Sequence, residues 1–164
     1  MDFSIYITYN GLSEGEIRAN IDKVYWSYVS EYSKLSEEFI REFHDKVDWS
    51  YISGCQELSE EFISEFRDKV NWYHISRAQK LSEGFIRKYA NKLIWYYISR
   101  HQRLSEGFIK DFAGRIYWGV ISRYQKLSEG FIRENINKLN INMILKYQDI
   151  TDNFKKTLEM MLVL

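Results

Sequence analysis

Residues that could perform catalysis are few in this sequence, and they do not stand together. The three histidines are His44, His74 and His101, and the single cysteine is Cys55. A metal site needs several such ligands at close spacing, and a nucleophilic cysteine needs a base fixed beside it. The sequence shows neither arrangement, nor a glycine-rich phosphate loop. We therefore interpret Cys55 as a structural residue and expect a non-enzymatic protein with no cofactor and no metal site.

Binding chemistry is more evident, because cations recur at a fixed spacing. One row, here called the basic ribbon, consists of Arg77, Arg100, Arg123 and Lys146, and a second row of Lys80, Arg103 and Lys126 follows three residues later. Aromatic residues accompany both rows: Tyr96, Tyr97, His101, Tyr124 and Tyr147. Cations with interleaved aromatics can bind an acidic protein or follow a nucleic-acid backbone. The alternative is a solvated face, in which the second row forms weak pairs with the glutamate three residues on.

Charge is divided unevenly between the two halves of the chain, although the total is neutral. Residues 1–80 carry 9 basic and 15 acidic side chains, whereas residues 81–164 carry 14 basic and 8 acidic ones. This division predicts one acidic and one basic half of the molecule, so that an anionic partner would bind the second half.

The fixed spacing arises from a tandem repeat of 23 residues. Copies begin at Leu12, Leu35, Leu58, Leu81, Leu104 and Leu127, and a shortened copy begins at Ile150. We number the positions of each copy 1 to 23 from this residue; all 5 tryptophans then fall at position 15. A fixed period of this length is typical of stacked repeat arrays. We predict one repeat domain over residues 1–164, with residues 1–11 as an N-terminal cap and 150–164 as a C-terminal half repeat.

Each copy must break into two helices. One continuous helix of this length would turn through about six turns plus roughly 140°, which would spiral the tryptophans around its axis. Position 2 is Ser or Thr and position 3 is acidic, as at a helix start. Position 11 carries Asp, Asn or Gly, which tolerate a left-handed residue after a helix. Asp48, Asn71 and Asn140 then offer a second N-cap. The prediction is an all-α solenoid of paired helices of roughly eight to ten residues, with the indoles buried between copies.

Four other repeated positions are expected to have structural roles and not to bind a ligand. The glutamines of position 22 are predicted to form a ladder that satisfies backbone groups at the helix-to-helix turn. Cations of position 12 are placed over the C-terminus of the first helix. Cations of position 7 are expected to lie on a solvated face, and the glycines of position 4 to allow close packing.

The C-terminal tail, Met160 to Leu164, is apolar but too short to span a bilayer. It either folds back to close the stack, which we favour, or pairs with a second copy as a homodimer. No basic, apolar leader precedes the repeats, and the single cysteine fits a reducing compartment, so a cytoplasmic location with no membrane association is expected.

The elements Leu-Ser-Glu-x-Phe-Ile, Lys-Val-x-Trp and Ile-Ser-x-x-Gln resemble the short tandem repeats of uncharacterised proteins encoded by giant DNA viruses and some bacteriophages. The resemblance covers nearly the whole chain and implies a viral or mobile-element protein acting inside a host cell. It carries no catalytic motif. We expect a binding scaffold that docks a protein partner, such as a host factor or a defence protein that it blocks; the alternative is nucleic-acid binding along the basic ribbon.

Overall fold

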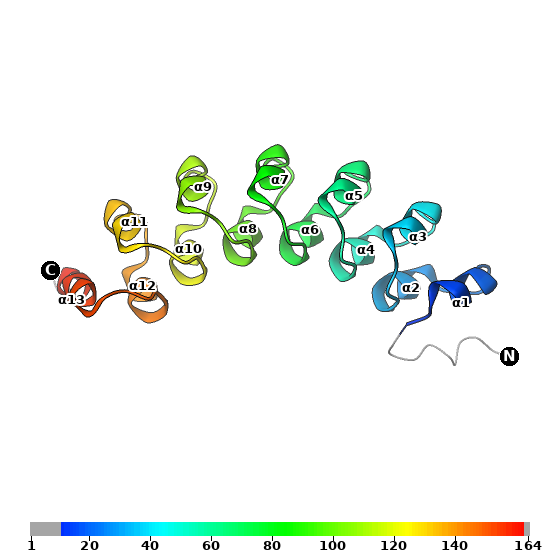
Figure 1. Ribbon diagram of the computed structural model, residues 1–164, viewed down its shortest axis with the longest axis horizontal. Coiled ribbons are helices and arrows are strands. Elements are labelled where there is room, and N and C mark those ends of the chain that lie inside the picture. Colours follow the sequence, from blue (N-terminus) through cyan, green and yellow to red (C-terminus); the bar gives the residue numbers. More distant parts are fainter. Residues whose placement is uncertain (1–10, 163–164) are drawn as a thin grey trace. The chain divides into compact units, whose positions relative to one another are not determined.

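The computed structural model describes residues 11–162, and within that range every regular element is a helix (Figure 1). Contacts divide the chain into two compact units, which meet between Leu81 and Ser82. The helices of unit 1 are α1 (Glu14–Ala19), α2 (Trp26–Tyr32), α3 (Glu37–Glu42), α4 (Trp49–Cys55), α5 (Glu60–Glu65) and α6 (Trp72–Ala78). Those of unit 2 are α7 (Glu83–Lys88), α8 (Trp95–His101), α9 (Glu106–Asp111), α10 (Trp118–Tyr124), α11 (Glu129–Glu134), α12 (Ile141–Tyr147) and α13 (Asp152–Met161). The predicted all-α repeat solenoid is confirmed; the single-domain boundary stays a prediction.

Each unit has two layers of helices. The odd-numbered helices, one at the start of each copy, form the first-helix layer, and the even-numbered helices form the second-helix layer (Figure 1). In unit 1 the second-helix layer packs α4 between α2 and α6, and in unit 2 it packs α10 between α8 and α12. Residues at equivalent positions of successive copies therefore form rows across each unit.

The core consists of the same few positions in every copy. In the second copy Phe39, Ile40 and Ile52 are fully buried, at 0% exposure. Their equivalents in the complete later copies are at most 5% exposed. Because helices this short are unstable alone, burial between neighbouring copies must supply most of their stability.

The helices are shorter than predicted, with 6 residues in α3 and 7 in α4. The prediction of a left-handed residue at position 11 of each copy is also wrong. Within residues 11–162 a positive φ occurs only at residue Gly11, which precedes the first copy. The chain instead stays right-handed after α3. Phe43 has φ −110° and ψ 27°, and its carbonyl accepts the N–H groups of Lys46 and Val47 at 2.9 and 3.1 Å. This hydrogen-bonded turn replaces the final turn of a longer helix.

The indoles are half-buried, so the prediction that they are sealed between copies is wrong. Each of four indoles donates its N–H to the carbonyl five residues earlier; for Trp49 the acceptor is His44, at 3.0 Å. That carbonyl belongs to the turn after the first helix, and the ring edge must stay near the surface to reach it. A position-12 cation of the next copy reaches the same turn: Lys69 Nζ lies 3.3 Å from the His44 carbonyl and 5.9 Å from the Trp49 ring.

The predicted glutamine ladder is confirmed. Gln56 Oε1 accepts the N–H of Leu35 at 3.1 Å, and its Nε2 donates to the carbonyls of Ser30 and Ser33 at 3.0 and 2.8 Å. Each such glutamine therefore joins the start of its own copy to the end of the preceding one. The fully buried serine of position 19 adds a second link, as Ser30 Oγ donates to the Trp26 carbonyl and accepts the N–H of Asp48.

The second predicted N-cap is also confirmed: the Asp48, Asn71 and Asn140 side chains accept backbone N–H groups at the starts of α4, α6 and α12. The position-4 glycines are not required for close packing. A Cβ at Gly84, Gly107 or Gly130 would meet only the serine hydroxyl two residues earlier, at 3.7 to 3.9 Å.

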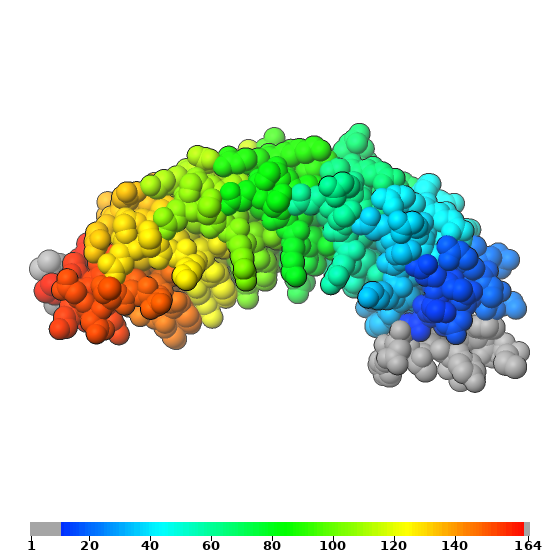
Figure 2. All heavy atoms as spheres, in the orientation of Figure 1, coloured from blue at the N-terminus to red at the C-terminus, as the bar shows by residue number. Residues whose placement is uncertain are grey.

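At the C-terminal end the closing side chains are Phe154 and Leu158 of α13, which are 3% and 1% exposed. Met160, Met161 and Leu162 are exposed, so this part of the tail does not fold back as expected. Figure 2 shows α13, in red, at the surface of unit 2. The expected cap over residues 1–11 lies outside the described residues except for Gly11, as do residues 163–164 of the tail.

Candidate partner interface

In unit 2 the two helix layers differ in charge. Helices α8, α10 and α12 contain no aspartate or glutamate, although each carries an arginine or lysine at position 20. The acidic residues of this unit lie on the first helices, apart from Asp149 in the turn after α12. The second-helix layer therefore presents positive charge that no acidic side chain of its own helices offsets.

Two cations at position 7 of the first-helix layer are paired with acids of the next copy. Arg87 lies 2.6 Å from Asp111 of the next copy, and Lys110 lies 2.6 Å from Glu134. The same cations lie over the phenylalanine at position 5 of the next copy, at 4.9 Å for Arg87 over Phe108. Position 7 therefore lies on a solvent-exposed face, as predicted, and Arg87 and Lys110 also use it to pair with the next copy.

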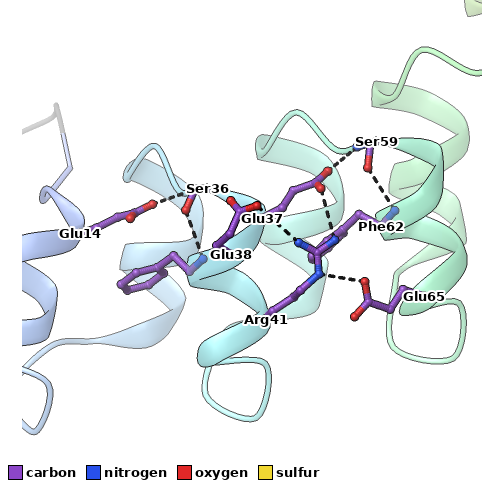
Figure 3. Close-up of polar contacts among 9 residues, drawn as sticks. Glu14, Ser36, Glu37, Glu38, Arg41, Ser59, Phe62 and Glu65 are labelled. Atoms are coloured by element: carbon purple, nitrogen blue, oxygen red, sulfur yellow. Dashed lines mark hydrogen bonds and ion pairs between the residues drawn. The ribbon is translucent and has the colours of Figure 1, made fainter.

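Unit 1 shows the same pairing in its first-helix layer. Figure 3 shows Arg41 between Glu37, Glu38 and Glu65, with the Glu65 carboxylate 2.9 Å away. The position-3 glutamates have a further role, since Glu37 Oε1 accepts the N–H of Ser59, the N-cap residue of the next copy, at 2.6 Å. The first-helix layer thus uses its charges to join neighbouring copies.

Cations of the second-helix layer in unit 2 lie on tyrosine rings. Arg100 is 4.9 Å from the centre of the Tyr124 ring, and Arg123 lies between Tyr124 and Tyr147, at 5.0 and 4.7 Å. Lys146 is 5.3 Å from Tyr147. Within residues 11–162 none of these three cations forms an ion pair, and all three are exposed. We call Arg100, Arg123, Lys146, Tyr124 and Tyr147 the basic tyrosine face.

The weak pairs of the alternative interpretation, between the second row and the glutamate three residues on, are not formed in unit 2. The Glu106 carboxylate accepts the Ser128 N–H at 2.6 Å, and Glu129 accepts the Thr151 N–H at 2.8 Å. Arg103 and Lys126 are consequently exposed cations that form no ion pair with the part of the chain that the structure describes. They lie in the turns that follow α8 and α10, next to the basic tyrosine face.

Not all predicted site residues belong to this face. Arg77 and Lys80 lie in unit 1, so the structure does not place them with the others. Tyr97 lies on α8 but stacks on His101, with ring centres 5.9 Å apart. Tyr117, which the sequence reasoning missed, is 52% exposed and meets Tyr96 edge-on at 5.6 Å. Its place at position 14, where other copies have a capping Asp or Asn, was the signal that could have found it.

Within residues 11–162 there is no group of three potential metal-ligating side chains, and no helix there is long and apolar enough to cross a bilayer. No protein-family model, curated protein or solved structure matches this chain.

Proposed function

We propose that this protein is a non-enzymatic scaffold that binds a partner protein, and that the basic tyrosine face binds an acidic segment of that partner. The observation that carries the proposal is the set of exposed cations without acidic partners on helices that contain no acidic residue. Arg87 and Lys110 of the first-helix layer, by contrast, are paired between copies. Arg100, Arg123 and Lys146 lack this pairing and lie on tyrosine rings instead.

The contacts of the tyrosines favour a protein over a nucleic acid. Proteins that bind single-stranded nucleic acid offer free aromatic rings on which bases stack. Here Arg100 and Arg123 both lie over Tyr124, and Arg123 and Lys146 both lie over Tyr147. A base would have to displace a cation to reach those rings. A carboxylate would instead meet arginines already held in place, with N–H donors suited to bidentate pairing.

Helix spacing suggests the form of the acidic segment. Packed helices lie roughly 8–10 Å apart, and three residues of an extended chain span about 10 Å. An extended peptide with an acidic residue at every third position would therefore match successive cations. The sequence resemblance to viral repeats extends the proposal to a partner inside a host cell, such as a host factor or defence protein.

The test is a fluorescence-anisotropy titration of the full chain with a labelled peptide that has glutamate at every third residue. A single-stranded oligonucleotide of equal charge serves as the second arm, and both are titrated over a series of salt concentrations. We expect the peptide to bind at low salt and more tightly than the oligonucleotide. Arg100→Glu with Arg123→Glu should weaken peptide binding by about tenfold or more, because both attraction and pairing are lost.

The matched control is Lys155→Glu with Lys156→Glu, which makes the same charge change on exposed residues of α13. We expect this control to weaken binding by less than about threefold, since these lysines belong to the first-helix layer and not to the basic tyrosine face, and salt screens exposed charges that make no direct contact. Equal loss in the two double variants would show that only net charge matters and would overturn the proposal. Failure of the peptide to bind at low salt would do the same, as would tighter, steeply salt-dependent binding of the oligonucleotide.

A further inference from the structure

The second-helix layer of unit 1 contains a pocket of about 690 Å³ between α4 and α6. Its lining includes Tyr51, Gly54, Cys55, His74, Arg77 and Ala78. Ligand pockets in proteins have volumes of about 300–1,000 Å³, so this one is large enough for an organic group.

The pocket lies where small residues replace the larger ones of other copies. Position 21 is tyrosine in three copies, Tyr32, Tyr124 and Tyr147, and each of these rings is about two-fifths exposed. In the two copies that form the pocket, position 21 is Cys55 and Ala78, and position 20 of the first of them is Gly54. Two neighbouring helices therefore both lack the ring that other copies place at this surface.

Unit 2 shows what normally occupies such a place. Arg123 at position 20 lies 5.0 Å from the tyrosine of position 21 in its own copy and 4.7 Å from that of the next. Arg77 is the same residue type at the same position, but its own copy has Ala78 instead of the ring. Within residues 11–162 the Arg77 guanidinium forms no hydrogen bond, ion pair or ring contact. Arg77 is therefore an exposed cation beside the place where three other copies have a tyrosine ring.

The other walls suit a neutral aromatic group. The His74 ring lies close against Gly54, since a Cβ built there would be 3.1 Å from Nδ1. Tyr51 supplies a second ring, and the lining residue Asp48 is already used as the N-cap of α4, where it accepts the N–H groups of Ser50 and Tyr51. Burial, and next the nearby Glu31 carboxylate, raise the pKa of the Cys55 thiol, so the thiol stays neutral.

We propose that this pocket receives one tyrosine side chain of the partner protein, with its ring on Arg77 as Tyr124 lies on Arg123. The inference rests on the proposed function in that the ring comes from a protein, but it uses none of the residues of the basic tyrosine face. Buried aromatic anchors commonly dominate the binding energy of an interface, so this pocket would contribute contact energy while unit 2 contributes charge attraction.

The test uses N-acetyl-tyrosinamide as the probe in an NMR titration of the ¹⁵N-labelled full chain, with N-acetyl-alaninamide as the control probe. We expect saturable shifts at the amides of Gly54, Cys55, His74 and Ala78 with the tyrosine probe only. Ala78→Tyr should abolish these shifts, because it supplies the missing ring within the chain. The variant should fold, since position 21 already carries tyrosine in three other copies.

Tyr124→Ala is the converse variant, since it removes a resident ring next to Arg100 and Arg123. It should create probe-dependent shifts in α10 that the unchanged protein lacks. No saturable shift around Gly54, equal shifts with the alanine probe, or shifts that persist in Ala78→Tyr would overturn the inference. Arg100→Glu with Arg123→Glu should leave the Gly54 shifts intact, so failure of the acidic peptide and failure of the tyrosine probe are separate results.

Discussion

Gln125 Oε1 accepts the backbone N–H of Leu104 at 3.0 Å, joining two residues that lie 21 positions apart at opposite ends of one copy. The side-chain amide of Gln125 also donates to the carbonyls of Ser99 and Gln102, at 2.9 and 2.7 Å, in the preceding copy. Gln125 is 5% exposed, so these backbone groups have little access to water.

Gln125→Ala should therefore lower the free energy of unfolding by about 3 kcal/mol, because it leaves one buried donor and two buried acceptors unpaired. Urea unfolding followed by circular dichroism would measure the change. Gln148 makes the equivalent three bonds but is half-buried, so Gln148→Ala should cost less. Equal costs at the two sites would show that water does not replace the lost bonds at Gln148.

Alanine at Gly84, Gly107 and Gly130 should stabilise the protein. These glycines lie inside first helices, and an added Cβ meets only ordinary van der Waals contact. Each substitution should raise the free energy of unfolding by roughly 0.5 kcal/mol, since glycine loses more backbone entropy on folding. Gly11 is the matched control, because its φ is +71° and an added Cβ would collide with the Tyr32 carbonyl. Gly11→Ala should destabilise, and the opposite order would contradict this account.

Trp72→Phe should cost only about 1 kcal/mol, the net value of one hydrogen bond, because the half-buried indole loses its bond to the Arg67 carbonyl and a modest contact area. Ile75→Ala, three residues away in α6, should cost about 2–5 kcal/mol because Ile75 is fully buried. Comparison of the two urea midpoints tests whether the indoles stabilise the protein as half-buried or as fully buried side chains. A larger cost for Trp72→Phe than for Ile75→Ala would restore the original prediction.

Acid should weaken the attachment of α13. Hydrogen bonds from the Thr151 N–H and hydroxyl to the Glu129 carboxylate hold the pKa of Glu129 below its ordinary value. A lowered folded-state pKa means that the stabilisation is complete above the unfolded-state pKa, about 4.3, and is lost as pH falls through the folded-state value. Amide exchange in α13 between pH 6 and 3 measures this loss. Glu129→Gln should remove much of the pH dependence, whereas Glu159→Gln, on an exposed residue of α13, should not.

Much of the fold could be predicted from the sequence because each feature depends on contacts within one copy or on a polar group with few possible partners. The Ser36 and Asp48 caps are local, and a recurring glutamine among apolar residues must bond to backbone. The turn after Phe43 could not be predicted, because Asp, Asn and Gly are compatible with several turn conformations. The exposure of the indoles was missed because aromatic content indicates burial but not which edge of the ring faces solvent.

The candidate site likewise contains features that the sequence predicts and features that only the structure shows. The row of Arg100, Arg123 and Lys146 follows from the period alone. Their contacts with Tyr124 and Tyr147 required the relative placement of adjacent helices. The pairing of Arg87 with Asp111 could have been found by comparing positions 7 and 8 of successive copies, 24 residues apart. The pocket at Gly54 could not be predicted. The small residues Gly54, Cys55 and Ala78 indicate that side-chain volume is missing, but not whether a neighbouring side chain fills the space.

The glutamine ladder has a consequence for how such a chain can change over evolutionary time. Within a unit, each glutamine bond joins one position of a copy to fixed positions of the copy before it, so every junction is of the same kind. Unequal crossing-over between two copies in the gene would insert or delete a whole repeat and leave all remaining junctions chemically unchanged. Descendants of this gene could therefore vary in copy number, so that the solenoid becomes longer or shorter while every junction between copies keeps the same hydrogen bonds.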